Sequence, residues 1–406
     1  MITPQTLKGF RDFLPSSARK RQYVITKLKA IFELYGFEPL ETPTLEYEEI
    51  LSGKYGEEGE KLMYRFEDNG KRRVAMRYDQ TVPLARVVAQ YQNQTENNDQ
   101  ALSLPFKRYQ IQNVWRADKP QKGRYREFLQ CDADIVGIHE GIADSEILAV
   151  VTKSIEALGF TQYKILINDR SVFENLPTEA IIIIDKLKKI GEENVIKELQ
   201  EKGFSKENFD RVKNAKIPES LQKIIEQADI LGVDCSKIEF SPTLARGLDY
   251  YTGLIFEIEI PTYPVGSVCG GGRYDNLLGL FTKNTIPAVG FAFGFDRIIE
   301  AMTESNLFPA HLQATATVLV TVFSSEYSDH SVKITKELRN AGIPTDLWMW
   351  DNAKIEKQLK YADQKHIPYV VIAGPEEISN QYVLLKNMKE RKQEKVTLSE
   401  AIKRLT

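Results

Sequence analysis

The chain has few of the residues that build disulfide frameworks or zinc sites. Among its 406 residues are only three cysteines and four histidines. The cysteines are odd in number, lie far apart and form no Cys-x-x-Cys pair, so we expect neither a disulfide framework nor a zinc ribbon. The histidines fit no zinc spacing, since His139-Glu140 lacks the second histidine of a His-Glu-x-x-His motif. The sequence therefore predicts no bound metal of this kind and favours a reducing compartment.

Long hydrophobic runs are also missing. The longest aliphatic run covers residues 181–184, which is far too short to span a bilayer. The first residues, Met-Ile-Thr-Pro, contain no basic region followed by an apolar stretch, so we expect no export signal. A Gly-x-x-x-x-Gly-Lys-[Ser/Thr] loop is absent too, which excludes P-loop nucleotide binding. We expect a cytoplasmic protein that makes no contact with membranes.

The chain has no strong charge of either sign. Its formal net charge of −3 argues against general attraction to nucleic acid, so any contact with RNA must come from local basic patches. With 42% hydrophobic and 27% charged residues, the composition is that of a globular protein with substantial cores. The length suits two or three domains.

A short stretch of alternating residues is the most informative part of the sequence. Residues 124–135 alternate as a β-strand does, with one polar, cationic face and one face that packs. The polar face consists of Arg124, Arg126, Phe128, Gln130, Asp132 and Asp134. Arg116 precedes the strand across a loop in which Asp118 is the only acid among several lysines and arginines. A hairpin of this kind can clamp a ligand that is both aromatic and polyanionic.

A second block, residues 288–299, predicts another ligand-facing strand. Gly290, Ala292 and Gly294 share one strand face, and three phenylalanines share the other. Glycine weakens a strand, so small residues in register indicate close approach of a flat ligand. Arg297 opens the following helix, where it is placed to meet a phosphate group.

These two blocks resemble the second and third motifs of class II aminoacyl-tRNA synthetases. The string Lys-Pro-Gln-Lys-Gly-Arg-Tyr-Arg-Glu-Phe, residues 119–128, is similar to the histidyl-tRNA synthetase version in particular. Two further strings, residues 244–253 and 269–275, resemble peptides peculiar to that family. Pro43 matches the proline of the first motif, which lies at a dimer interface in the family. Asp118 and Asp296 depart from the motifs, which usually have glutamate at these positions.

The resemblance implies roles for individual residues. ATP would be bound by Arg116, Asp118, Arg124, Phe128, Gly294 and Arg297. Histidine would be bound by Asp79, Thr81, Arg116, Gln130, Asp134, Arg246, Tyr250, Tyr251 and Tyr274. Arg246 and Arg116 would be the catalytic arginines, and Lys119, Gln121 and Arg126 would meet the acceptor end of the tRNA. Asp79 and Thr81 would lie on one face of an extended segment and hold the substrate ammonium group.

The chemistry of amino-acid activation agrees with these residue types. The substrate carboxylate attacks the α-phosphate of ATP, so the enzyme supplies positioning and positive charge rather than a nucleophile of its own. Arginine is suitable because its planar donors hold phosphate oxygens bidentately. Neutral imidazole offers one donor and one acceptor, so a selective pocket should present an acceptor and a hydroxyl. Asp134 and Tyr251 match the family positions that do this.

The expected architecture is α+β. The resemblance implies a catalytic domain over residues 1–310, built on an antiparallel sheet flanked by helices. Lysine- and glutamate-rich helical spacing at about 172–238 predicts a helical insertion. Apolar runs that alternate with helical segments predict a C-terminal α/β domain over residues 316–406, with a largely parallel sheet. This part resembles an anticodon-binding domain.

The function implied by the resemblance is the activation of L-histidine with ATP and the transfer of the histidyl group to the 3′ end of tRNA(His). Mg²⁺ is expected with ATP, with its ligands unassigned, and a cytoplasmic homodimer is expected. One alternative is the catalytically inactive, synthetase-like regulatory subunit of ATP phosphoribosyltransferase. Such paralogues usually lack the C-terminal domain and parts of the Arg-Gly-Leu-Asp-Tyr-Tyr string, and this chain has both. Another alternative is a domain that binds tRNA without catalysis.

Overall fold

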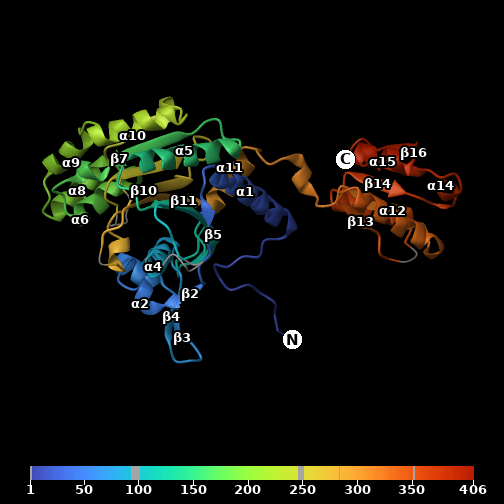
Figure 1. The fold of residues 1–406 in the computed structure, drawn as a ribbon, viewed down its shortest axis with the longest axis horizontal. Helices are drawn as coiled ribbons and strands as arrows, with labels where there is room; N and C mark the ends of the chain where they lie inside the picture. The colour runs from blue at the N-terminus through green and yellow to red at the C-terminus, as the bar shows by residue number, and fades with distance from the viewer. Residues whose placement is uncertain (1, 93–100, 122, 246–250, 283, 351–352) are drawn as a thin grey trace. The chain divides into compact units, whose positions relative to one another are not determined.

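The computed structural model describes residues 2–406, except 93–100, 122, 246–250, 283 and 351–352 (Figure 1). Backbone contacts divide the chain into two compact units. The first unit comprises the residues up to Asp12 together with Arg21–Leu307. The second comprises Phe13–Lys20 and Phe308–Thr406. Each unit has its own sheet and its own hydrophobic core.

A mixed sheet organises the first unit. In the described residues its strand order is β1 (Glu38–Pro39), β5 (Phe106–Trp115), β6 (Glu127–Val136), β11 (Ala288–Gly294), β10 (Cys269–Arg273), β9 (Leu254–Glu259), β7 (Lys164–Asp169) and β8 (Ile238–Phe240). Neighbouring strands from β5 to β7 are antiparallel, whereas the β1/β5 and β7/β8 pairs at the two edges are parallel. The expected antiparallel sheet is therefore confirmed for the centre of this unit.

Helices cover one face of this sheet. Helix α1 (Pro15–Leu34) buries Val24, Leu28 and Phe32, which are spaced four residues apart and form one stripe. The ring of Phe32 lies 6.1 Å from the ring of Phe291 on β11. Helices α5 (Ile142–Ala157) and α11 (Phe295–Glu304) contact β11 and β6. The aromatic face of β11 thus fills core, as its sequence pattern predicts, and the opposite face of the strand is left for a cavity.

The first unit also contains a smaller sheet and several helices that pack near it. The sheet has the order β2 (Leu45–Tyr47), β4 (Arg73–Met76) and β3 (Arg65–Glu67). Its helical neighbours are α2 (Glu48–Leu51), α3 (Gly56–Leu62) and α4 (Thr81–Tyr91). Helix α4 buries Val82, Leu84, Ala85 and Val88 against the loop that follows β10.

The expected helical insertion lies between β7 and β8. It consists of α6 (Thr178–Asp185), α7 (Leu187–Ile190), α8 (Glu192–Glu201), α9 (Lys206–Lys213) and α10 (Glu219–Ile230), and Figure 1 shows α6, α8 and α9 grouped together. Its core contains Ile181, Ile184, Leu199 and Phe209. The aliphatic run at residues 181–184 therefore lies in a helix that buries three of its four isoleucines, whereas Ile182 is exposed. None of the helices in the described part of the chain combines the length and apolar character needed to cross a bilayer.

The second unit is an α/β structure. Its sheet has the order β13 (Thr345–Leu347), β12 (Val318–Val320), β14 (Tyr369–Ile372), β15 (Val383–Asn387) and β16 (Lys392–Val396). The helices of Phe308–Thr406 are α12 (Ser328–Asn340), α13 (Ile355–Gln364), α14 (Pro375–Ser379) and α15 (Leu398–Leu405). Strands β13, β12 and β14 are parallel, as expected, but β15 and β16 are antiparallel to their neighbours. Only a few residues separate β15 from β16, which is too short a connection for a parallel crossover.

Close packing between β10 and β11 makes a glycine necessary at position 271. A Cβ atom there would lie 2.7 Å from the Cα atom of Phe291 on the neighbouring strand. We expect Gly271→Ala to lower the free energy of unfolding by about 1–3 kcal/mol, because a methyl group would push the strands apart. Urea unfolding of the purified variant measures this loss. The control is Gly279→Ala, where the nearest atoms lie 3.8 Å from the added carbon. Equal midpoints for both variants would contradict the prediction.

Candidate active site

Two adjoining cavities occupy the open face of the large sheet. The outer cavity has a volume of about 780 Å³ and the inner one about 310 Å³. Both are lined by Arg116, Phe128, Phe293, Gly294 and Arg297, so they form one continuous site. The two motifs singled out in the sequence thus meet at the boundary between the cavities.

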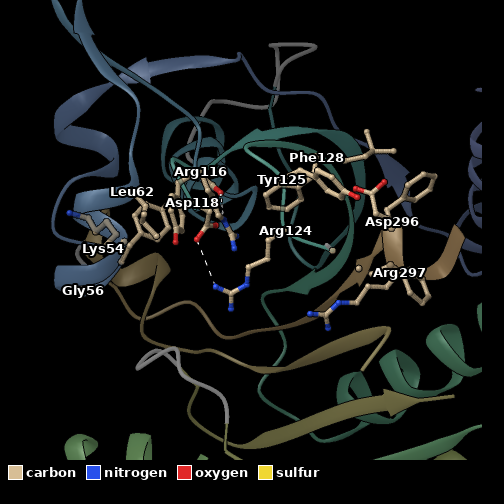
Figure 2. Close-up of a pocket in the computed structure, with 18 of the residues that line it drawn as sticks. Lys54, Gly56, Leu62, Arg116, Asp118, Arg124, Tyr125, Phe128, Asp296 and Arg297 are labelled. Atoms are coloured by element: carbon tan, nitrogen blue, oxygen red, sulfur yellow. Dashed lines mark hydrogen bonds and ion pairs between the residues drawn. The ribbon is translucent and has the colours of Figure 1, made fainter. Parts of the chain in front are cut away.

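Arginines from separate segments line the outer cavity, which Figure 2 shows. Arg116, which directly follows β5, lies with its guanidinium carbon 4.4 Å from the ring centre of Tyr78 and 5.2 Å from that of Phe128. Its Nε donates a hydrogen bond to the carbonyl oxygen of Tyr78 over 3.1 Å. These contacts fix the plane of the guanidinium group at the junction of the two cavities.

Two further arginines stand on either side of the open space. Arg124 extends from the hairpin loop, is more than half exposed and lies 4.0 Å from Asp118. Arg297 projects from the first turn of α11 and donates to the carbonyl oxygen of Ser267 over 2.8 Å. Figure 2 shows both guanidinium groups extending past the hairpin toward the same region. The outer cavity can therefore present positive charge to a ligand that carries several phosphate groups.

Carboxylates, by contrast, line the inner cavity. Asp79, Asp132 and Asp134 each expose less than a tenth of their surface, and all three line this cavity together with Thr81, Gln130, Tyr251 and Tyr274. Burial raises the pKa of all three carboxyl groups, because desolvation disfavours the charged form. An amino acid bearing one or two cationic groups is the ligand that such a pocket would favour.

Asp134 has two strong partners inside the protein. It forms an ion pair with Arg108 over 2.6 Å, and the guanidinium group of Arg108 is fully buried. The hydroxyl group of Tyr274 donates a hydrogen bond to the other oxygen of the same carboxylate. Both partners favour the charged form of Asp134 and oppose the effect of burial on its pKa. The cross-strand register explains the pairing, because Arg108 on β5 lies directly opposite Asp134 on β6.

The absence of a side chain at Gly290 leaves room for the carboxylate of Asp134. Gly290 on β11 pairs with Asp134 in the sheet, and an added Cβ would overlap the carboxyl group. Our interpretation that Gly290 is small to admit a ligand was therefore incomplete, since its small size is required by a neighbouring side chain. Gly294, which lines both cavities, would place a Cβ atom 3.4 Å from Arg297, so that position is less crowded.

Asp79 is held in a turn. Its Oδ1 accepts hydrogen bonds from the hydroxyl group of Tyr55 over 2.8 Å and from the backbone N–H of Val82 over 3.2 Å. The expectation that Asp79 and Thr81 share one face of an extended segment was wrong, because Thr81 is the first residue of α4. The turn nevertheless brings both residues into the inner cavity.

The other predicted residues differ in what can be said of them. Arg246 and Tyr250 lie outside the described residues. Tyr251 is buried and packs against Leu166, Leu244 and Ile255 while also lining the inner cavity. Lys119 and Gln121, predicted to meet tRNA, are exposed in the hairpin loop.

Arg126 binds the protein's own backbone. Its Nε donates to the carbonyl oxygen of Asp118 over 3.0 Å, and its Nη1 lies 3.4 Å from that of Lys8. Its backbone N–H donates to the carbonyl oxygen of Gly9 over 2.9 Å. Arg126 therefore fastens the N-terminal segment to the hairpin, a contact that the strand pattern did not predict.

Arg11 connects the N-terminal segment to α11, which begins in the third motif. Its guanidinium carbon lies 3.1 Å from the ring centre of Tyr125, and its Nη2 lies 2.8 Å from Asp296 at the start of α11. Asp296 also accepts from Arg21 over 2.8 Å. No spacing pattern in the sequence could reveal these pairs, because Arg11 and Asp296 are 285 positions apart. They hold the N-terminal segment, the hairpin and α11 in one assembly.

Sequence reasoning missed Asp132 in the inner cavity and two residues that hold its other carboxylates in place. Arg108 and Tyr55 were given no role, although they are partners of Asp134 and Asp79. Asp132 was placed on the polar face of its strand without a function. The alternation that located Gln130 and Asp134 was the available signal for Asp132. In the described residues, no group of three or more histidine, cysteine, aspartate or glutamate side chains is arranged to hold a metal ion.

The chain is similar to known proteins in both sequence and structure. The family model described as histidyl-tRNA synthetase matches residues 9–205 and 174–298, and the anticodon binding domain model matches residues 317–406. A histidine–tRNA ligase of Cytophaga hutchinsonii is 39% identical, with complete coverage of both chains. The crystal structure of histidyl-tRNA synthetase from Nostoc sp. PCC 7120 is similar, with a TM-score of 0.85, 32% identity and complete coverage of both chains.

A further solved structure is relevant to the alternative function. It carries the description ATP phosphoribosyltransferase regulatory subunit/histidyl-tRNA synthetase and comes from Bacillus halodurans C. It resembles this chain with a TM-score of 0.70 at 20% identity, covering 89% of this chain and 97% of that one. At this level of identity the likeness concerns the fold alone.

The buried pair between Arg108 and Asp134 generates a stability prediction. We expect Arg108→Met to lower the free energy of unfolding by about 3–5 kcal/mol, because Asp134 would lose its charge partner in a buried position. The matched control is Lys107→Met on the same strand, where a partly exposed ion pair with Glu146 should contribute at most about 1 kcal/mol. Chemical unfolding at pH 7 measures both losses. A loss for Arg108→Met no larger than that of the control would contradict the prediction.

Proposed function

This chain belongs to the histidyl-tRNA synthetase family, and we propose that its inner cavity binds histidine while its outer cavity binds ATP. The activity is that of a histidine–tRNA ligase. Histidine and ATP form histidyl-adenylate and pyrophosphate, and the histidyl group is then transferred to the 3′ end of tRNA(His). One observation carries the assignment of the cavities. A pocket lined by buried carboxylates adjoins a larger pocket lined by arginines, and Arg116 belongs to both.

The position of Arg116 supports a catalytic role in adenylate formation. The reacting carboxylate of the amino acid and the α-phosphate of ATP must meet where the two cavities join. A guanidinium group held there between two rings can bind an oxygen of each reactant and stabilise the charge that develops on the phosphate. We assign the second catalytic role to Arg246 on its match to the family string alone.

The outer cavity provides suitable contacts for the rest of ATP. Phe128 offers an aromatic face for adenine, and Asp118 an acceptor for the adenine amino group. Arg124 and Arg297 would bind phosphate oxygens, and Gly294 lets the nucleotide approach the strand. Mg²⁺ would enter with ATP, because it neutralises the β- and γ-phosphates, and we assign it no protein ligands.

The inner cavity offers complementary groups for histidine. Asp134 would accept a hydrogen bond from the imidazole ring, and its fixed partners, Arg108 and Tyr274, keep the carboxylate oriented for that purpose. Tyr251 and Tyr250 would complete this side of the pocket. Asp79, Thr81 and Gln130 would bind the α-ammonium group. A side chain unable to pair with these buried polar groups would be rejected, by about 10⁴- to 10⁵-fold in favourable cases.

We assign the remaining partners from the domain organisation. The catalytic domain would cover residues 1–310, with the helical insertion at about 172–238, and the domain over 316–406 would bind the anticodon of tRNA(His). Lys119, Gln121 and Arg126 would approach the acceptor end. We also propose a cytoplasmic homodimer formed near Pro43, a proposal supported by the exposed apolar side chains of Leu45, Tyr47 and Phe66 on the small sheet.

The regulatory-subunit alternative receives less support. The model of the anticodon binding domain matches residues 317–406, and the relative from Cytophaga hutchinsonii is similar over its complete length. The likeness to the structure from Bacillus halodurans C extends to the fold, which both functions share. An inactive paralogue has no need for arginines grouped around a nucleotide-sized cavity.

ATP–pyrophosphate exchange with each amino acid tests the proposed function. We expect exchange with histidine alone, because only an imidazole pairs with Asp134 and its hydroxyl neighbours. Asp134→Asn should lower kcat/KM for histidine by about 10- to 100-fold, the effect of losing a charge-assisted hydrogen bond. The control Asp68→Asn alters an exposed turn and should leave exchange unchanged. Equal exchange with another amino acid would overturn the specificity, and no exchange by folded protein would favour a binding role.

The hairpin loop generates a separate prediction. Lys119→Ala should slow transfer to tRNA about tenfold and spare exchange, because Lys119 is exposed and loss of a phosphate contact weakens binding of tRNA alone. Arg126→Ala should impair both reactions, because Arg126 also fixes the N-terminal segment to the hairpin. Single-turnover transfer and steady-state exchange measure the two effects. Unchanged transfer by Lys119→Ala would exclude a contact between this side chain and tRNA.

A further inference from the structure

Asp132 is a buried carboxylate that the roles proposed above leave unused. It lies on β6 between Gln130 and Asp134, on the same strand face, and lines the inner cavity. Only 3% of its surface is exposed. Its two carboxylate oxygens accept hydrogen bonds from Nε2 of Gln130, over 3.3 and 3.2 Å. Unlike Asp134, it forms no ion pair with a lysine or arginine among the described residues.

The groups around Asp132 leave it short of positive charge. Arg108 faces it from β5, but this guanidinium group is already paired with Asp134. Asp79 faces it from the turn before α4, and the same cavity is lined by Cys269 on β10 and by Tyr274, which directly follows that strand. Strand β11 contributes the uncharged Ala292, directly opposite Asp132, and Gly290. The cations Arg116 and Arg297, and the phenol of Tyr251, line the same cavity.

Burial, together with the neighbouring acids, favours the protonated form of Asp132. Burial raises its pKa to about 8, Arg108 opposes this shift, and Asp134 and Asp79 reinforce it. Below pH 8 the empty pocket therefore holds Asp132 mainly as the neutral carboxylic acid. A cation that entered the pocket would favour the carboxylate instead.

Gln130 supplies a second, independent indication of a missing donor. Its Oε1 is buried and has no hydrogen-bond partner among the described residues, while its Nε2 is engaged with Asp132. A buried acceptor without a donor is costly, so this oxygen indicates where a ligand N–H group binds. An ammonium group has three N–H donors. Asp79, Gln130 Oε1 and Asp132 provide three acceptors in one cavity.

We propose that Asp132 is a second carboxylate acceptor for the α-ammonium group of bound histidine, alongside Asp79, and that it loses its proton when histidine binds. This inference rests on the proposed binding of histidine in the inner cavity. The step breaks the O–H bond of the Asp132 carboxylic acid, and the proton passes to solvent. The ammonium group keeps its three hydrogens, and its charge is balanced by the carboxylate that forms.

Proton release on binding distinguishes this role from a purely structural one. The full chain is titrated with histidine at pH 7.5 in two buffers of different ionisation enthalpy, and the difference in heat gives the number of protons released. We expect the wild type to release most of one proton per site. Between pH 6.5 and 8 its affinity for histidine should rise with pH, approaching tenfold per unit at the lower end.

Asp132→Asn is the decisive variant, because the amide has the shape of the neutral acid and cannot ionise. It should release almost no proton, should show an almost flat affinity between pH 6.5 and 8, and should bind histidine about tenfold more weakly at pH 8. Asp132→Glu should keep the pH dependence. Imidazolepropionate, which lacks the α-amino group, should release no proton from the wild type.

Thermal unfolding of the ligand-free proteins supplies a test that does not depend on binding. The raised pKa of Asp132 makes the wild type lose stability as the pH rises from about 4 toward 8, whereas Asp132→Asn lacks this loss. The melting temperature of the variant, relative to the wild type, should therefore increase from pH 5 to pH 8. A constant difference between the two proteins would overturn the proposal.

The outcomes separate this inference from the proposed function. If folded wild type fails to bind histidine, the assignment of the inner cavity is wrong. If histidine binds, but the wild type and Asp132→Asn release the same number of protons, only the role of Asp132 is overturned. Proton release by imidazolepropionate equal to that by histidine would also overturn it, because the imidazole ring would then be the cause.

Discussion

The buried ion pair between Arg108 and Asp134 is the interaction on which the rest of the site depends. It joins β5 and β6 of the large sheet beside the inner cavity, and both side chains are almost completely buried. A charge in such a place is tolerated only when it is paired and hydrogen-bonded. The surrounding sequence satisfies this condition. Gly290 leaves room for the carboxylate, and Tyr274 supplies a further donor.

The separation of charge between the two cavities follows from the same sheet. Carboxylates project from the middle of β6 into the inner cavity, whereas the arginines lie at strand ends, in a loop and on a helix around the outer one. The proposed sites for histidine and ATP therefore differ in charge and share a boundary at Arg116. Arg116 lies at the junction of the two cavities. Its guanidinium group is held there by aromatic rings rather than by a carboxylate.

Much of this arrangement could be predicted from local patterns. Alternation along residues 124–135 identified Phe128, Gln130 and Asp134 as neighbours on one face, because the period of a strand is independent of its partners. The same pattern in residues 288–294 separated the cavity side of β11 from its core side. Local patterns could not reveal Arg108, whose role arises from register with another strand, or Tyr55, which reaches Asp79 from a distant loop. The turn at Asp79 was misread as extended because a side chain, rather than a repeat, fixes its conformation.

The long-range contacts of the N-terminal segment constrain the order in which the site can assemble. Gly9 and Arg11 are translated well before their partners Arg126 and Asp296. The contact with Arg126 can form once the hairpin has been translated, whereas the ion pair between Arg11 and Asp296 must wait until α11 has been translated. Nascent chains that stall before α11 emerges would lack Asp296 and Arg297, so their outer cavity would remain incomplete even where the strands beneath it have already paired.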